Sequence, residues 1–437
     1  YIPCTAMEKK FISQKLNLVA ASAYSKKSGS PFIFYQGNAS GMLKSVVRSV
    51  APYGKVIALY TQKSYLKRGM EFADALSGVC SKVLGVIVSD KTDIVKAAAQ
   101  ILRAPEDVRA VITSDHSLSP LASYVAKAAK VPYIYIMVTP RTEGILSPRL
   151  LLKNGDRADC VPINIKRHII IDADEVEKAS VIPASSKTPA RRVGVAELFI
   201  TAESKIPALA DYRAYLSVSG EKPDVAAYDL LREAVRDAYN SFLKKEKEII
   251  PSLIYDCILA EIANALSGGR LCDFSALRFA EFLLSGEKRL PPEEILELYC
   301  RISGIYALFS SGLFNEILSV PDYRGRAHAL SEKTNTDVHG FAEGLLKQTA
   351  AISVKADNAE NAVKRLSSEL GKQNESAGKV RSSYTAFGGK TLAEIYGEEK
   401  AKIRTEEINA AIKLCGDSPF GVNGMSLARE KGVTEYI

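Results

Sequence analysis

The 437-residue sequence is poor in the side chains that bind metals and form cross-links. It has four histidines, no tryptophan and seven cysteines, and the cysteines are dispersed without a C-x-x-C pair. Dispersed cysteines in a large chain are typical of buried thiols in a reducing compartment and argue against a zinc–cysteine site. No apolar run reaches the roughly 18–20 residues of a membrane-spanning helix. We therefore expect a cytoplasmic protein without a membrane span.

Charge of one sign is not concentrated anywhere in the chain. The 58 basic and 50 acidic residues give a net charge of +8, and basic residues cluster only briefly, as at Arg191-Arg192 and Lys244-Lys245. A nucleic-acid surface would need a basic stripe with interleaved aromatic residues. The sequence also has neither a G-x-S-x-G motif nor a P-loop. These patterns argue against nucleic-acid partners and against the common nucleophilic hydrolases.

What the first half does have is a regular alternation of apolar runs and helical stretches. Apolar side chains make up 47% of the residues, which is ample for a core. Near-continuous apolar strands that alternate with helices are typical of a parallel sheet covered on both faces. The expected strands are Pro31–Tyr35, Lys55–Tyr60, Lys82–Val88, Arg109–Thr113 and Tyr133–Val138.

The length and the change of pattern predict four segments. They are an N-terminal lead (1–30), a doubly wound Rossmann-like α/β domain (31–185), an all-α domain (190–371) and C-terminal helices and loops (372–437). Ser180–Arg192, rich in Ser, Pro and basic residues, is the expected connection. The all-α domain should contain helices at Leu209–Leu216, Tyr228–Lys247, Pro251–Leu266, Ser275–Leu284, Pro292–Ser311, Val338–Val354 and Glu360–Gly371.

The most specific stretch of the sequence is Val131–Asp172. Its parts, in order, are a β-rich run ending at Thr139-Pro140, the turn Thr142-Glu143-Gly144, the pair Ser147-Pro148, the hairpin signal Lys153-Asn154-Gly155-Asp156 and a second β-rich run closing on Asp172. This order and spacing resemble those of the glycerol-1-phosphate dehydrogenases. That family belongs to the broader group of iron-containing alcohol dehydrogenases, glycerol dehydrogenase and dehydroquinate synthase. A second match is Lys205–Arg213, which is similar to the family's K-x-T-A-L-A-D-W-R helix.

The resemblance implies a dehydroquinate synthase-like architecture and an NAD(P)-dependent chemistry on a small phosphorylated metabolite. In the family, the acidic residue of the turn, here Glu143, meets the substrate's hydroxyls, and the threonine, here Thr142, lies near the nicotinamide. Thr139 and Lys205 occupy further site positions. A divalent metal, held by one Asp and two His, polarises the substrate oxygen.

The chain departs from the family at each position that holds a cofactor. The glycine-rich turn that receives the pyrophosphate falls on Thr113–His116, so that Ser114 and His116 are the remaining candidates for nucleotide contacts. Asp115 would place a negative charge there, and Thr61-Gln62-Lys63 replaces the acidic residues that meet the adenine ribose. The metal positions fall on Thr201, Leu277 and Ser285. A zinc or other divalent site would have to be rebuilt from the carboxylates Glu197, Glu203, Asp273 and Glu281.

These departures favour a protein that keeps the fold while its activity is lost or altered, with weakened NAD(P) binding and no metal. Its role would be binding or scaffolding, as a homo-oligomer or as a partner of an active homologue. The alternative is an active NAD(P)-dependent polyol-phosphate dehydrogenase that reduces dihydroxyacetone phosphate at a rebuilt site. A third reading is a metal-independent enzyme with His116 and Lys205 as anion contacts. His168, His328 and His339 are expected to be structural residues.

Overall fold

A computed structural model of the chain describes most of the N-terminal half and parts of the rest. The described ranges are 6–23, 31–89, 93–103, 107–154, 157–180, 224–242, 246–269, 275–285, 385–386, 390–391 and 405–415, with the single positions Lys205, Ala208, Asp211, Tyr212, Leu271, Leu298, Ile302, Asn423 and Met425. Every structural statement below refers to these residues.

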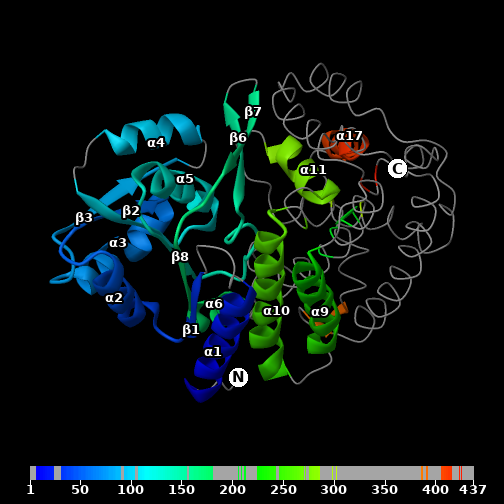
Figure 1. Ribbon diagram of the computed structural model, residues 1–437, viewed down its shortest axis with the longest axis horizontal. Helices are drawn as coiled ribbons and strands as arrows, with labels where there is room; N and C mark the ends of the chain where they lie inside the picture. Colours follow the sequence, from blue (N-terminus) through cyan, green and yellow to red (C-terminus); the bar gives the residue numbers. More distant parts are fainter. Residues whose placement is uncertain are drawn as a thin grey trace, which may run out of the picture.

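The N-terminal half folds around a six-stranded, fully parallel sheet (Figure 1). The strand order is β1-β8-β5-β4-β2-β3. The strands are β1 (Phe32–Gln36), β2 (Lys55–Tyr60), β3 (Lys82–Ile87), β4 (Val108–Thr113), β5 (Tyr133–Met137) and β8 (Arg167–Asp172). The predicted parallel α/β sheet is confirmed, and each expected strand lies within one or two residues of its observed bounds.

Helices cover both faces of the sheet, as the near-continuous apolar strands require. Alternate residues of β2 separate the two layers: Val56 and Ala58 pack with α2 (Ala39–Val50) and α3 (Gln62–Leu76). Ile57 and Leu59 belong to the other layer, which includes α4 (Ile94–Leu102) and α5 (Ser119–Ala129). The strand that closes Val131–Asp172 ends at Asp172, whose carboxylate accepts from Ala39 N and Glu175 N, both at 3.1 Å. This residue therefore caps α2 and α6 (Ala173–Ser180) and is structural.

An N-terminal helix, α1 (Ala6–Ala23), closes the β1 edge of the sheet. It lies within the segment 1–30 that the sequence indicated as an N-terminal lead. Asn17 bonds to both backbone groups of Ile33, with Nδ2 donating to the carbonyl oxygen at 2.5 Å and Oδ1 accepting from the amide at 2.9 Å. The Ser13 hydroxyl does the same for Tyr35, at 3.0 and 2.6 Å. Two side chains thus take the place of a neighbouring strand.

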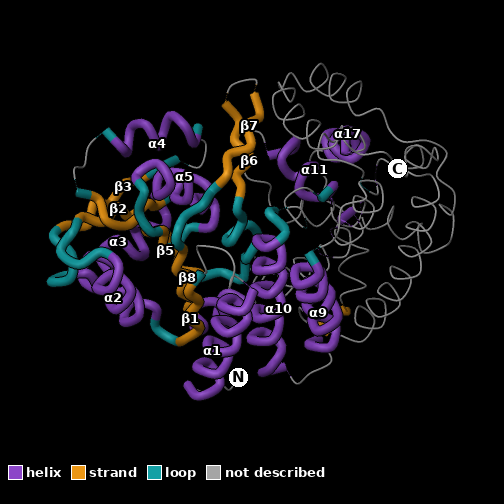
Figure 2. Tube along the Cα trace, viewed as in Figure 1, coloured by secondary structure: helices purple, strands orange, loops and turns teal. Residues whose placement is uncertain are grey.

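The rest of the described chain is helical apart from two small hairpins (Figure 2). The predicted hairpin after Ser147-Pro148 is present as the antiparallel pair β6 (Arg149–Asn154) and β7 (Arg157–Pro162). The later helices are α9 (Val225–Phe242), α10 (Glu246–Leu266), α11 (Ala276–Ser285) and α17 (Thr405–Cys415). Loops and a surface helix were expected between 372 and 405, and the described residues there instead form the short ladder β9 (Thr385–Ala386) with β10 (Lys390–Thr391).

Three of the predicted later helices have observed counterparts, and the others cannot be placed. The stretches Tyr228–Lys247, Pro251–Leu266 and Ser275–Leu284 correspond to α9, α10 and α11. The predicted helices Pro292–Ser311, Val338–Val354 and Glu360–Gly371, most of Leu209–Leu216 and the connection beyond Ser180 lie outside the described residues. Among the described helices, none combines the length and the apolar character needed to cross a bilayer.

Candidate functional site

The strand order places a ligand crevice between β2 and β4. The chain runs outward from β2 to β3 and then returns to the other side of β2 as β4, so the order reverses at this point. In open parallel sheets, ligands bind beyond the carboxyl ends of the strands at such a reversal. The residues at that position here are Thr61, directly after β2, and Ser114 and Asp115, directly after β4.

A side-chain hydrogen bond bridges this crevice. Asp115 Oδ2 accepts from Thr61 Oγ1 at 2.7 Å, across the gap between the two strand ends. Its other oxygen, Oδ1, accepts from Ser117 Oγ at 2.8 Å and from Ser117 N at 3.3 Å. The Asp115 amide in turn donates to Thr113 Oγ1 at 3.1 Å. Both carboxylate oxygens are therefore engaged within the protein, and the strand ends are joined.

The residues at this crevice do not fit a dinucleotide. A pyrophosphate at a helix N-terminus needs free backbone N–H groups and close backbone approach. Here the Ser117 amide already binds the Asp115 carboxylate, and a bound diphosphate would meet that negative charge at short range. Ser114, a predicted nucleotide contact, is buried, and its hydroxyl has no hydrogen-bond partner among the described residues.

The turn after β5 brings together the other predicted site residues. Thr139 is half-buried at the end of the strand, and Thr142 is fully buried within the turn. Gly144 has a φ of +74°, a left-handed conformation that favours glycine, and an added Cβ would lie 3.8 Å from Nη2 of Arg278. The Gly144 amide donates to Glu261 Oε2 at 3.0 Å, so the turn is bound to the helix α10.

Glu261 is the centre of a buried connection that the sequence did not indicate. Its second oxygen, Oε1, lies 3.4 Å from Lys205 Nζ, and both side chains are at least 95% buried. Lys205 was predicted on the substrate side of the site. Its ammonium lies against a carboxylate that also holds the Gly144 amide, so this pair joins the turn to the helical part, and the substrate-side role of Lys205 stays a prediction.

His116 and Glu143, two predicted site residues, lie close to each other. Nε2 of His116 is 3.8 Å from a carboxylate oxygen of Glu143, and Nδ1 is 3.4 Å from the Tyr135 hydroxyl. Burial, with the nearby guanidinium groups of Arg141 and Arg278, lowers the pKa of His116 to about 4, against the opposing effect of Glu143. The imidazole is therefore neutral at pH 7 and is not a cationic anion contact in this state.

The helix α11 adds an ion pair beside this group. Arg278 donates to Glu281, one helical turn further on, and burial raises the pKa of the Glu281 carboxyl. Arg141 and Glu143 also act on Glu281 electrostatically. Two guanidinium groups, of Arg141 and Arg278, and two carboxylates, of Glu143 and Glu281, thus lie near one another where the turn meets α11.

The predicted metal positions offer no set of ligands within the described residues. Leu277 is an apolar side chain and is buried in the core, and Glu281 is paired with Arg278. No group of three His, Cys, Asp or Glu side chains converges anywhere among the described residues. The other positions, Thr201, the alternative carboxylates Glu197, Glu203 and Asp273, His328 and His339, lie outside them, as does the side chain of Ser285. Of the predicted and alternative metal positions, only the side chains of Leu277 and Glu281 are therefore described, and the absence of a metal stays a prediction.

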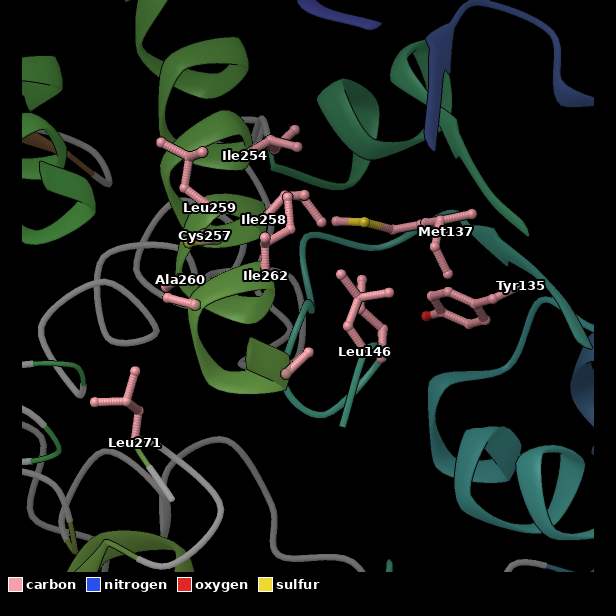
Figure 3. Close-up of a cluster of buried hydrophobic side chains, with 14 of the residues drawn as sticks. Tyr135, Met137, Leu146, Ile254, Cys257, Ile258, Leu259, Ala260, Ile262 and Leu271 are labelled. Carbon is pink, nitrogen blue, oxygen red and sulfur yellow. The ribbon is translucent and has the colours of Figure 1, made fainter. Parts of the chain in front are cut away.

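Apolar side chains fill the contact between the end of β5, the following turn and α10. Figure 3 shows Met137 at the end of β5 and Leu146 after the turn pointing toward Ile254, Ile258 and Ile262 of α10. The α10 helix is buried on almost every side from Ile250 to Leu266. Side chains rather than an open channel therefore occupy this part of the contact between the sheet and the helices.

Sequence reasoning missed Glu261 as a site residue, and it missed the contact of Thr61 with Asp115. A signal for Glu261 existed, because the apolar helix α10 contains three buried polar residues, Asp256, Glu261 and Asn264. Buried polar groups need partners, so their presence in such a helix indicates contacts with a neighbouring element. No comparable signal links Thr61 to Asp115, which are 54 residues apart in the chain.

A separate hollow lies away from all predicted site residues. A groove of about 1170 Å³ opens between α1, the carboxyl end of β1 and α2, with Phe34 and Met42 among its lining residues. The ion pair between the buried Lys9 Nζ and the exposed Asp174 Oδ1, 2.5 Å apart, also lines this groove. None of the predicted site residues lines this groove.

The sheet, its crevice and the following helices together define a dehydroquinate synthase-like fold of the kind found in iron-containing alcohol dehydrogenases. A probable glycerol dehydrogenase from Sinorhizobium meliloti aligns with a TM-score of 0.52 over 92% of this chain and 95% of its own, at 10% identity. An archaeal halo-thermophilic alcohol dehydrogenase from a Red Sea brine pool aligns with a TM-score of 0.51 over 93% and 97%, at 13% identity. Neither a protein family model nor a curated protein matches the sequence. At these identities the similarity extends to the fold alone, and the predicted fold class is confirmed.

Proposed function

We propose that this chain is a glycerol-1-phosphate dehydrogenase-like protein that has lost nucleotide-dependent hydride transfer and has a binding or scaffolding role. The observation that carries the proposal is the Asp115 carboxylate, which binds Thr61 and Ser117 where a dinucleotide would place its pyrophosphate. Three supports are independent of it: Leu277 at a metal position, Lys205 paired with Glu261, and a neutral His116.

The alternative of an active dehydrogenase requires an electrophile in place of the metal. Stabilising the developing charge on the substrate oxygen contributes several kcal/mol of catalysis in comparable enzymes. Lys205 is a buried cation in one of the family-like motifs, and its ammonium lies 3.4 Å from Glu261 Oε1. The charge distribution therefore favours lost or altered activity.

Titration with NADH and NADPH, with and without Zn²⁺, tests this proposal. A ligand present at 100 times its dissociation constant adds about 2.7 kcal/mol of stability, which a melting curve detects. We expect no shift at millimolar nucleotide and no oxidation of NADH with dihydroxyacetone phosphate. Micromolar binding with turnover would refute the proposal and establish the active alternative.

A variant pair makes the titration specific to the crevice. Asp115→Gly removes the internal carboxylate and should allow weak binding of inorganic phosphate or ADP that the parent protein lacks. Asp93→Gly is the matched control. Like Asp115, Asp93 follows a strand and accepts from backbone amides at the start of a helix, here Val95 and Lys96 of α4, but it follows β3 and not β4. Phosphate binding by the parent protein equal to that of the Asp115 variant would contradict the role given to this carboxylate.

A further inference from the structure

The groove beside α1 has the size and the walls of a small-molecule site. It lies at the carboxyl end of β1, with α1 and α2 on either side of the strand (Figure 1). Lys10, Gln14 and Leu18, spaced four residues apart on one face of α1, line one wall. Ligand sites commonly have volumes of about 300–1,000 Å³, and the 1170 Å³ of this groove is slightly more than that.

The groove has a charged end and an apolar end. Asn17 and Ser13 of α1 bond to successively later residues of β1, so the helix runs antiparallel to the strand. Lys10 therefore lies at the end where β1 leads into α2, and Leu18 lies beside the first half of the strand. The eight residues between them correspond to about 12 Å along a helix. The groove is thus polarised along its length.

The charged end has an excess of positive charge. Among the described residues that line the groove, Lys9, Lys10 and Asp174 are the charged ones. Lys9 Nζ lies 2.5 Å from Asp174 Oδ1, so these two charges offset each other. An added Cβ at Gly37 would collide with the Asp174 carboxylate, which shows how closely this pair approaches the turn after β1. The exposed ammonium of Lys10 remains, and it matches a ligand with a single negative charge.

The remainder of the groove offers apolar contact. Leu18 is 70% exposed, and Phe34 of β1 and Met42 of α2 are half-buried. A hydrocarbon chain placed against these three side chains would remove apolar surface from water on both molecules, which is favourable. A helix of a protein partner fits less well. Such a helix is about 10–12 Å wide, so this volume would hold only about two of its turns.

We propose that the groove binds a medium-chain carboxylate, a linear amphiphile with one negative charge. Its carboxylate lies at Lys10, and its hydrocarbon chain passes Phe34 and Met42 toward Leu18. The charge excess, the apolar walls and the distance between the two ends each match one part of such a ligand. None of the candidate site residues lines the groove, so this inference does not depend on the proposed function.

Isothermal titration calorimetry of the full chain with decanoate, kept below the concentration at which it forms micelles, tests the proposal. We expect saturable binding of one molecule per chain. Decanol lacks the charge and acetate lacks the hydrocarbon chain, so both should bind more weakly. Lys10→Glu and Leu18→Asp remove the two ends of the match, and each should raise the dissociation constant about tenfold or more, equivalent to about 1.4 kcal/mol.

Two matched controls repeat these substitutions outside the groove. Lys44→Glu reverses an exposed charge on α2, and Leu66→Asp replaces a leucine on α3 that is 78% exposed. Neither residue lines the groove, and both variants should bind decanoate as the parent protein does. Absence of saturable binding, or equal affinity in all four variants, would overturn the proposal.

Hydrogen exchange of the parent protein gives a reading that does not depend on the variants. Decanoate should slow the exchange of backbone amides between Gln36 and Met42, where the strand leads into α2, and leave those of β3 unchanged. Protection confined to other elements would contradict the assigned position. Binding to phosphatidylglycerol vesicles without binding of monomeric decanoate would identify a membrane surface as the partner and would also overturn the proposal.

Discussion

At the scale of single residues, two charged side chains of the candidate site bind within the protein. Asp115 binds Thr61 and Ser117, and Lys205 binds Glu261. Each of these side chains could have contacted a ligand, and each is instead held by a partner from another part of the chain. The sequence indicated that the glycines had been replaced, but not that the replacing carboxylate would bridge two strands.

His116 gives a pH-dependent prediction at the same scale. Its pKa is lowered from the ordinary 6.5 to about 4 in the folded protein, so the unfolded state takes up a proton first as the pH falls. Stability should therefore decrease as the pH falls from about 6.5 to 4, by on the order of 2–3 kcal/mol from this group, and level off below its folded pKa.

Chemical denaturation of the parent protein and of His116→Gln at a series of pH values measures this contribution. The variant lacks the titrating group, so its unfolding free energy should depend less steeply on pH in this window. His168, whose pKa burial also lowers to about 4, remains in both proteins and cancels in the comparison. Superimposable pH profiles would show that His116 is not buried as a neutral group.

At the scale of elements, β-rich runs were predicted well because their physical cause is local. The Lys55–Tyr60 strand has the predicted bounds, since an uninterrupted apolar run of this length fits a buried parallel strand. The start of α3, at Gln62, has a weaker sequence signal. Its N-terminus is set by a capping box between Thr61 and Ser64, and a serine in the second position is a weaker signal than the usual acidic or amide residue.

The contact of α1 with β1 gives a second prediction, at the scale of an element. Asn17→Ala removes two hydrogen bonds to the Ile33 backbone, each of which contributes roughly 1 kcal/mol net. The Ile33 amide should therefore exchange with solvent about tenfold faster or more, because a tenfold change corresponds to about 1.4 kcal/mol. Gln14→Ala, at an exposed position of the same helix, should leave this exchange rate unchanged. Equal rates in both variants would mean that α1 does not protect the edge.

At the scale of the whole molecule, Glu261 connects the sheet to the helical part. It accepts from Gly144 N and lies beside Lys205 Nζ, with almost no exposure to solvent. Removing one member of a buried ion pair leaves an uncompensated charge and costs about 3–5 kcal/mol. Glu261→Ala should lower the unfolding free energy by that amount.

Two further variants separate charge from packing at this position. Lys205→Met combined with Glu261→Leu removes both charges and should be less destabilising than Glu261→Ala alone. Asp107→Asn is the control, because it breaks an ion pair with Arg109 that is more than half exposed and should change stability by less than about 0.5 kcal/mol. A Glu261→Ala variant as stable as this control would show that the pair does not hold the two parts together.

The fold was predictable from the sequence to a much greater extent than the site. Strand periodicity and the Val131–Asp172 stretch are local patterns, and they led to the parallel sheet and its following helices. The partners of Lys205 and Asp115 depend on which elements meet in space, which no local pattern determines. The segment boundaries, the position Thr201 and the side chain of Ser285 are not tested by the described residues.

The closure of the β1 edge by α1 has a consequence for aggregation. An open sheet edge can add the strand of another chain and so extend the sheet. Asn17 and Ser13 occupy the Ile33 and Tyr35 backbone groups, so this edge is closed to such an addition. Loss of the α1 contacts would expose these backbone groups and make the protein prone to aggregate.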